Sequence, residues 1–587
     1  MSIHTHRSRS RRSDAPNIST KFDVSKYIIG TIAAMMVVVP LLCGSSFLTN
    51  VGKVFAFEVL GAVLISFLIL TVRTEGIAQR IKENLQSGPN MLVLGVVACG
   101  VVTFLMNPMN KWLAVPELVR IIVCAAVYFG VAYNLRGRLT LLTDVILATS
   151  AAVALFGLAG VGDRDFSQGN GITGSFGTHE ALGSFLMLML PITASMAIFD
   201  RKDEKRRLAA QAISLIIVVC LAFSQSRSGW IGELVALGVL AALATRFYTT
   251  KNAAPRQKLI AVLPFAAFLA IGVFIVAVSG SGMDVQQRLG TLGSGSTDLS
   301  MHQRLQLWHA ALVMIAAKPI FGWGLGSFPY IASRFTTVAL PAGFVASNGA
   351  NLTNIAHNYY LQTAAETGLV GLGLYAAMLV TFFVVGLRAL KGMKDGGRKV
   401  VLIGVLAAMS GQVIDAITSP SYNIASISLF QWLLMGIGMF AAGVPVQAEE
   451  TEEEPVRNEV SLGKNLRRGL AGLAAATVCL SSIGLFVATA GTAVADSYNR
   501  HGISDTDAWL IGIGAGGAGY FIGASLAHGD GHHNHGGGSN NGGGPGNGNG
   551  QGNGSGASPT SYQDNSQIND RVNAQVNSQV NSQLQTQ

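Results

Sequence analysis

Two isolated arginines and one isolated histidine stand in polar stretches between long apolar runs: Arg227, Arg304 and His357. Each guanidinium offers a planar fork of donors that stays charged at any working pH, so two of them suit a diphosphate. A nearby histidine can accept a proton from a hydroxyl close to neutral pH. Together the three side chains could neutralise a diphosphate leaving group and activate an acceptor hydroxyl. Glycosyl transfer from a lipid diphosphate needs this chemistry, and it uses neither a metal nor a cofactor.

These residues also have simpler interpretations. Arg227 lies at the junction of two apolar runs, where an unpaired guanidinium is costly unless it faces water, a carboxylate or a phosphate. It could therefore snorkel towards water or pair with Glu233. His357 could cap a helix or pack at its mouth. The residue types alone leave both alternatives open.

The composition is that of a polytopic membrane protein. Half of the 587 residues are apolar, 12% are charged and the mean hydropathy is +0.44, which is too hydrophobic for a soluble enzyme. The net charge of +9 does not indicate nucleic acid as a partner, because Lys and Arg form short clusters between apolar runs. All five cysteines fall inside apolar runs, without the spacing of a zinc site or a disulfide framework.

Repeated apolar runs of spanning length must position the three polar side chains. They predict an all-α protein with about twelve core transmembrane helices and a large external loop. Residues 27–279 supply the first nine helices and residues 368–445 the last three. The predicted spans are 27–48, 54–72, 91–106, 114–133, 140–160, 178–199, 208–223, 229–245, 258–279, 368–387, 399–416 and 424–444.

The distribution of basic residues predicts which loops face the cytoplasm. Most of the 40 Lys and Arg residues fall in the basic tail, residues 1–26, or in every second loop. Basic residues collect in the cytoplasmic loops of membrane proteins, so the other loops face outside. These are 161–177, the turn at 224–229, the long loop at 280–367 and 418–423. All three candidate chemical residues belong to this second set.

The long external loop contains a predicted amphipathic helix and a glycine-rich turn. Residues 300–317 have helical apolar spacing, which places Arg304 in the N-terminal turn of a helix on the membrane surface. Residues 321–328 read Phe-Gly-Trp-Gly-Leu-Gly-Ser-Phe. No strand precedes these glycines and no Lys-Ser/Thr pair follows them, which argues against a phosphate loop. They indicate a tight turn that lines a cleft.

After residue 445 the composition of the chain changes. Residues 446–468 form an acidic cytoplasmic linker, and 469–527 could add two helices, for fourteen in all, or be processed at a signal-like site. Residues 528–587 begin with a Gly/Asn/His-rich stretch that predicts disorder. Its four histidines could hold a metal weakly, but a flexible linker is the favoured interpretation.

Several short motifs occur in an order that resembles a known family. Ala356–Gln362 with Glu366 and Gly368 resembles the HNxYLQ...ExG signature of the O-antigen ligase and polymerase superfamily of bacterial membrane glycan transferases. The turn at 226–229 resembles its SRSG motif, and 304–328 its R...W...P...GxGxGxF segment. Residues 174–182 resemble its GxFGNPNxLA segment, but Thr178-His179-Glu180 replaces Asn-Pro-Asn. No polar contact is therefore carried over at those three positions. The resemblance covers roughly residues 30–445.

The resemblance implies a GT-C-like enzyme of the inner membrane whose site faces the periplasm. Such an enzyme moves an undecaprenyl-diphosphate-linked glycan to an acceptor sugar hydroxyl, without nucleotide or metal. By position, Arg227 and Arg304 would bind the diphosphate and His357 would be the base, with inversion at the anomeric carbon. Glu366 could support His357 or Arg304, or simply orient its helix.

Two weaker candidates and several activities remain open at this level. Tyr359 could stack on sugar or line the membrane interface, and Arg164 could touch the glycan. The acceptor could be lipid A core, the next lipid-linked repeat unit, or Ser or Thr of a secreted protein. A transporter or flippase is the rival from another class. It predicts paired charges within the membrane and an inverted repeat, which the sequence does not display.

Overall fold

The computed structural model describes a helical protein, and all but one of the ranges below lie within residues 22–444. They belong to one compact unit, Met1–Asp530. The described residues are 22–42, 46–75, 87–107, 111–161, 171–200, 203–247, 270, 299–332, 355–394, 396–419, 421–444 and 459–460.

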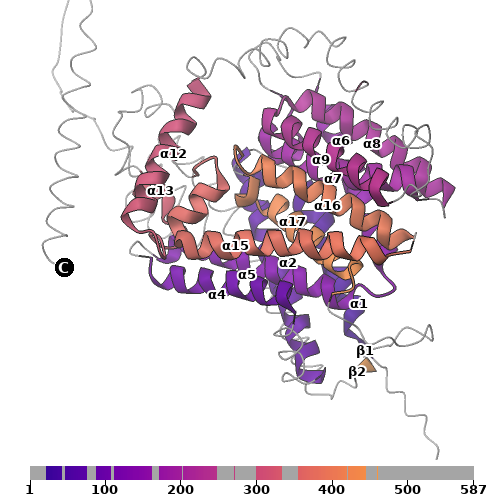
Figure 1. Ribbon diagram of the computed structural model, residues 1–587, viewed down its shortest axis with the longest axis horizontal. Helices are drawn as coiled ribbons and strands as arrows, with labels where there is room; N and C mark the ends of the chain where they lie inside the picture. The colour runs from indigo at the N-terminus through magenta and orange to yellow at the C-terminus, as the bar shows by residue number, and fades with distance from the viewer. Residues whose placement is uncertain are drawn as a thin grey trace, which may run out of the picture. The chain divides into compact units, whose positions relative to one another are not determined.

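The helices account for nearly all of this structure (Figure 1). In chain order they are α1 (Val24–Leu41), α2 (Ser46–Glu75), α4 (Gly88–Leu105), α5 (Lys111–Asn134), α6 (Leu139–Ala159), α7 (His179–Phe199), α8 (Glu204–Ser224), α9 (Arg227–Phe247), α12 (Leu299–Ala317), α13 (Phe328–Ile331), α15 (Tyr359–Gly392), α16 (Gly397–Asp415) and α17 (Ala425–Ala441). Two 3₁₀ turns, η2 (Gly174–Phe176) and η4 (Ser421–Asn423), join them. The described strands, β1 (Phe22–Asp23) and β2 (Glu459–Val460), form one short antiparallel pair.

The prediction of an all-α polytopic membrane protein is confirmed. Within the described ranges, 10 helices are long and apolar enough to cross a membrane, and α17 is a shorter apolar helix. Every predicted span except 258–279 coincides with one of these helices. Apart from residue 270, that span lies outside the described residues, as do the tail up to residue 21, nearly all of the acidic linker, and the regions 469–527 and 528–587. Their predicted organisation stays a prediction.

Helix α7 lies at the centre of the described bundle. Almost all of its side chains are buried, including the polar Ser184, Thr193 and Ser195. A helix that is apolar on every side is stable only when neighbours cover it all round. Helices α8, α9 and α16 pack against α7 and supply that cover. The N-terminus of α7 is consequently fixed by several helices at once, and the candidate site lies there.

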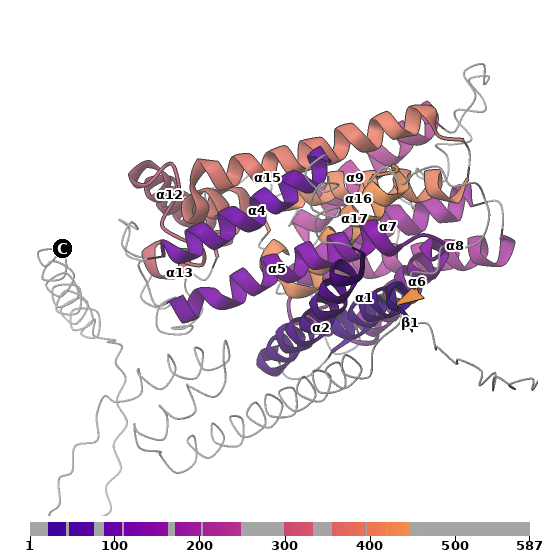
Figure 2. The same ribbon diagram turned by 90° about the horizontal axis from the view of Figure 1, so that it is seen from below.

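Helix α15 contains a kink that separates a short first segment from the spanning segment. Gly368 has φ +70° and ψ −175°, which are not helical. A Cβ at this position would lie 2.1 Å from the carbonyl oxygen of Ile320, so only glycine fits. Beyond the kink α15 runs beside α4, and α12 packs against α15 (Figure 2). The kink coincides with the predicted start of this span at 368 and leaves Tyr359–Thr367 as the segment next to His357.

Candidate functional site

Helices α7 and α9 run parallel in close contact, which fixes the position of Arg227. Gly183 on α7 faces Ser226 and Gly229, and one turn further along Met187 contacts Gly232. Two successive contacts of this kind set both the direction and the register of the pair. Arg227, the first residue of α9, therefore lies at the same end of the bundle as the first turn of α7.

The turn before α9 is built by the residues of its short motif. Helix α8 ends at Ser224, and its C-cap, Gln225, adopts the left-handed conformation with φ 52°. The Oγ of Ser226 then accepts the backbone N–H of Gly229 at 3.2 Å, as an N-cap side chain does. This cap starts α9 at once, so Arg227 falls in the first turn of a helix rather than in a loose loop.

We predict that Gly183→Ala disturbs the site through this helix contact. A Cβ at 183 would lie 2.3 Å from Cβ and 2.6 Å from Oγ of Ser226, so α7 and α9 would have to separate. Overpacking of this kind costs about 1–3 kcal/mol. Thermal unfolding of the purified variant is the measurement, and the melting temperature should fall. Gly238→Ala on α9 is the control, because nothing lies within 4 Å of that Cβ position. Equal melting temperatures for the two variants would contradict the prediction.

Arg304 forms an ion pair with Glu180 in the first turn of α7. Its Nη2 lies 2.5 Å from Oε1 of Glu180, and the two side chains are 16% and 26% exposed. A helix N-terminus favours negative charge because its first backbone N–H groups have no partner within the helix. The Glu180 carboxylate thus occupies a position suited to an anion, between a helix N-terminus and a guanidinium. The predicted helix 300–317, which carries Arg304, is present as α12.

His357 lies half-buried in the loop that leads into α15. It has φ 49°, a left-handed conformation that is uncommon for a residue other than glycine. The N-cap of α15 follows directly, since the side chain of Asn358 accepts the N–H of Leu361 at 3.0 Å. The Nδ1 of His357 is buried and has no hydrogen-bond partner among the described residues. No described residue therefore fixes this nitrogen by a hydrogen bond.

The surroundings of His357 lower the pKa of its imidazole below the ordinary value of about 6.5. Burial is the largest cause, because it disfavours the charged form. Arg304 lowers the pKa further by repulsion, whereas the Glu180 carboxylate raises it. His357 is therefore neutral near pH 7, which is the form that can accept a proton. These effects also show that Arg304, Glu180 and His357 form one electrostatic group.

The proposed pairing of Arg227 with Glu233 is not formed. Glu233 is 6% exposed, and neither of its carboxylate oxygens has a hydrogen-bond partner within the described part of the chain. This removes one alternative to an anion-binding role for Arg227, and the role itself stays a prediction.

Glu366 binds the glycine-rich turn. Its carboxylate accepts the backbone N–H groups of Gly326 at 3.0 Å and Phe328 at 3.2 Å. It also accepts a hydrogen bond from Gln362, with Nε2 3.4 Å from Oε1. These contacts correspond to the orienting role rather than to support of His357 or Arg304. The three glycines of this turn all have positive φ, as a tight turn requires.

Of the two weaker candidate residues, Tyr359 and Arg164, the structure describes only Tyr359. The Tyr359 ring stacks on Tyr422 with centroids 4.4 Å apart and meets Tyr375 edge-on at 5.3 Å. It lines a small cavity rather than the group formed by Arg304, Glu180 and His357. Arg164 lies outside the described residues. Within the described ranges no group of three or more His, Cys, Asp or Glu side chains could hold a metal ion.

Sequence reasoning missed Glu180. The departure from Asn-Pro-Asn at residues 178–180 argued against any polar contact there, yet the structure places the ion pair with Arg304 at this point. The available signal was the start of an apolar helix after Thr178, whose side chain accepts the N–H of Ala181 and caps α7. An acidic residue in the first turn of a capped helix marks a position that favours negative charge.

Comparisons with known proteins agree with these motifs. Residues 212–376 match the family model described as O-Antigen ligase, a range that includes Arg227, Arg304 and His357. The chain is 22% identical over 254 residues to an uncharacterized protein of Haemophilus influenzae, covering 41% of this chain and 59% of that protein. It is 28% identical over 295 residues to the exopolysaccharide production protein ExoQ of Rhizobium meliloti, covering 49% and 64%. The chain thus spans less than two thirds of either relative. The resemblance of the motifs to the O-antigen ligase and polymerase superfamily is thus supported by the match over residues 212–376 and by the similarity to ExoQ.

Proposed function

We propose that the protein transfers a glycan from a lipid diphosphate carrier to an acceptor hydroxyl. The observation that carries the proposal is the group formed by Arg304, Glu180 and His357, at the end of the bundle where α9 begins with Arg227. A guanidinium that already holds a carboxylate can hold a phosphate in the same way. A neutral imidazole beside it can accept the proton of a hydroxyl.

The proposed reaction is a single displacement. Arg227 and Arg304 bind the diphosphate and stabilise the negative charge that develops on it as the bond to the anomeric carbon breaks. His357 takes the proton of the acceptor hydroxyl while that oxygen forms the new glycosidic bond. One attack from the opposite face inverts the anomeric carbon. The proton then leaves His357 for solvent, which restores the neutral imidazole.

We infer that the carrier is undecaprenyl diphosphate and that the site faces the periplasm across the bacterial inner membrane. The support is the charge pattern, because the loops with Arg227, Arg304 and His357 alternate with the loops rich in Lys and Arg. Carrier lipid in the outer leaflet would present its diphosphate at the interface where α7 and α9 begin. No nucleic acid takes part.

The proposed function has two versions, a polymerase and a ligase, which differ in the acceptor. The name of ExoQ concerns exopolysaccharide production, which favours a polymerase whose acceptor is the next lipid-linked repeat unit. The description O-Antigen ligase favours transfer to the core sugar of lipid A. Both versions use the same donor and the same base, so they differ only in the molecule that supplies the hydroxyl.

Deletion of the gene followed by profiling of surface glycans tests the function. Single repeat units left on the carrier would support the polymerase, whereas long polymer on the carrier with a bare lipid A core would support the ligase. The full chain should restore the wild-type profile. If deletion changes neither the surface glycans nor the carrier-linked pool, the proposed function is wrong.

A further inference from the structure

We propose that Arg120, Asn423 and Gln362 are positioning residues for His357. They form a hydrogen-bonded chain, from here called the α5–α15 relay, that begins at a guanidinium on α5 and ends at the peptide before the histidine. In so far as His357 acts as the base, the inference rests on the proposed function. The three residues lie outside the group of Arg304, Glu180 and His357.

The relay ends at the backbone of Ala356, which is fully buried. Its N–H donates to Oε1 of Gln362 at 3.1 Å, and its carbonyl accepts from Nε1 of Trp308 at 3.1 Å. Both polar groups of this residue are thus held by side chains, one from α15 and one from α12. With Asn358 fixed as the N-cap on the other side, His357 is clamped between two anchored residues. Such a clamp is what a left-handed backbone needs at a residue other than glycine.

Gln362 reaches back over the first turn of α15 to make this contact. A helical side chain points towards the N-terminus of its helix, which brings the Gln362 amide to the loop that precedes the helix. The same Oε1 accepts from Nδ2 of Asn423 at 3.3 Å, and Nε2 faces the Glu366 carboxylate at 3.4 Å. The amide is therefore oriented on both sides.

Arg120 gives the relay its direction. A guanidinium can only donate, so Oδ1 of Asn423, 3.3 Å from Nη2, must face it. That orientation turns Nδ2 of Asn423 towards Gln362, whose oxygen then faces the Ala356 N–H. The guanidinium of Arg120 at one end and the N–H of Ala356 at the other can only donate. The side-chain amides of Asn423 and Gln362 between them therefore have one possible orientation each. The order cannot be reversed without breaking a hydrogen bond.

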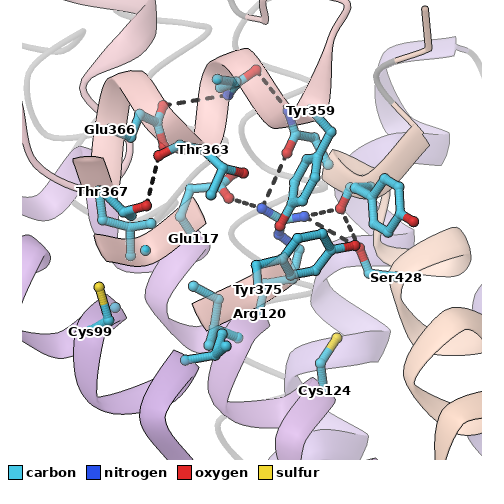
Figure 3. A pocket seen from close by; sticks show the side chains of 18 of the residues that line it. Cys99, Glu117, Arg120, Cys124, Tyr359, Thr363, Glu366, Thr367, Tyr375 and Ser428 are labelled. Atoms are coloured by element: carbon cyan, nitrogen blue, oxygen red, sulfur yellow. Dashed lines mark hydrogen bonds and ion pairs between the residues drawn. The ribbon is translucent and has the colours of Figure 1, made fainter. Parts of the chain in front are cut away.

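Arg120 itself is firmly anchored. Its side chain is 13% exposed and forms an ion pair with Glu117, and it also donates to the carbonyl of Tyr422. A further contact, 3.3 Å long, joins Nη1 to Oγ of Ser428 (Figure 3). Charged hydrogen bonds to several partners hold a side chain more tightly than neutral ones. The relay therefore starts from a fixed point on α5 and η4.

The relay borders a cavity of about 60 Å³ between α4, α5, α15 and α17. Gln431 lines the same cavity and donates to the hydroxyl of Tyr375, a residue outside the relay, at 3.0 Å. It is fully buried, like the end of the relay. This provides a matched control, because Gln362→Leu and Gln431→Leu make the same change on the same cavity.

The experiment follows the reactivity of His357 with diethyl pyrocarbonate, which acylates neutral imidazole. The full chain in lipid nanodiscs is treated over a range of pH, and the His357 peptide is quantified by mass spectrometry. Gln362→Leu and Asn423→Ala should each speed acylation of His357 several-fold and move its titration towards the ordinary histidine value, since a released loop exposes the ring. Gln431→Leu should match wild type.

Glycan transfer provides the second readout, with lipid-linked glycan extracted from the deletion strain as donor. Displacement of a base by about an ångström can lower a rate about 100-fold, so kcat should fall by about 10- to 100-fold with KM unchanged. Unaltered acylation of His357 in both Gln362→Leu and Asn423→Ala would overturn the inference. Altered acylation with full transfer would uphold the positioning of His357 and instead contradict its proposed role as base. If Gln362→Leu does not fold, acylation of His357 in Asn423→Ala, a change at a half-buried position, tests the inference by itself.

Discussion

Replacement of His357 by alanine is expected to lower kcat for glycan transfer by about 10²- to 10⁴-fold, the usual contribution of a general base. Donor binding should persist, because the arginines remain. Transfer by the purified chain, with lipid-linked glycan as donor, is the measurement. His309→Ala on the exposed side of α12 is the matched control and should retain activity. Undiminished transfer in His357→Ala would remove the proposed base.

The pH dependence of wild-type transfer tests the same residue. Burial and Arg304 lower the pKa of His357, so the neutral base should predominate already at mildly acidic pH. Activity should therefore rise with pH through a midpoint below about 6.5 and then level off. Glu180→Gln removes a carboxylate that favours the imidazolium, so the midpoint should move to lower pH. Arg304→Gln removes a repelling cation, and its residual activity should show a midpoint at higher pH. Shifts in the same direction would contradict this assignment.

Replacement of Arg304 by glutamine is expected to weaken donor binding strongly. Loss of one partner of a buried, hydrogen-bonded charge pair costs about 2–5 kcal/mol, which is roughly a 30- to several-thousand-fold rise in Kd. Arg304→Lys should recover only part of the affinity, since an ammonium lacks the planar fork that grips a phosphate. Binding of lipid-linked glycan to the chain in nanodiscs is the measurement.

Two further variants make this test specific. Arg138→Gln breaks another partly buried ion pair, with Asp23 at 2.7 Å, and should leave the donor Kd unchanged. Glu180→Gln should bind the donor more tightly than wild type, because the diphosphate no longer competes with a carboxylate for Arg304. Equal donor affinity in wild type and Arg304→Gln would show that the diphosphate binds elsewhere.

The sequence was sufficient to predict the helices, whereas the roles of Arg227, Arg304 and His357 stay predictions. Apolar runs of spanning length identify membrane helices reliably, because every backbone polar group in lipid must be satisfied within its own helix. Arg304 and His357, 53 positions apart, could be paired only through motif order, and the structure brings them together through Glu180. The useful signal was that these cationic side chains stand alone between apolar runs, because an isolated charge beside the membrane is costly unless it has a partner or a function.

Glu180 and the α5–α15 relay could not be derived from the sequence. Arg120 lies inside a predicted span with Glu117 three residues before it, which reads as an ordinary local ion pair. Its link to Asn423 depends on how α5 packs against η4 and α17, more than 300 residues further along. No periodicity or spacing encodes such a contact. The family match over residues 212–376 includes Arg304 but not Glu180, so it gives no hint of the ion pair.

The Glu180–Arg304 pair bears on how the enzyme would ignore the lipids that surround it. Phospholipid headgroups vastly outnumber carrier lipid, and each presents a phosphodiester with a single negative charge. A guanidinium that is already matched by an internal carboxylate gives such a headgroup one cation fewer to bind. A diphosphate brings a second charge with which to displace Glu180. The resting chain would thus discriminate by valence, and ordinary membrane lipid would be a poor competitive inhibitor.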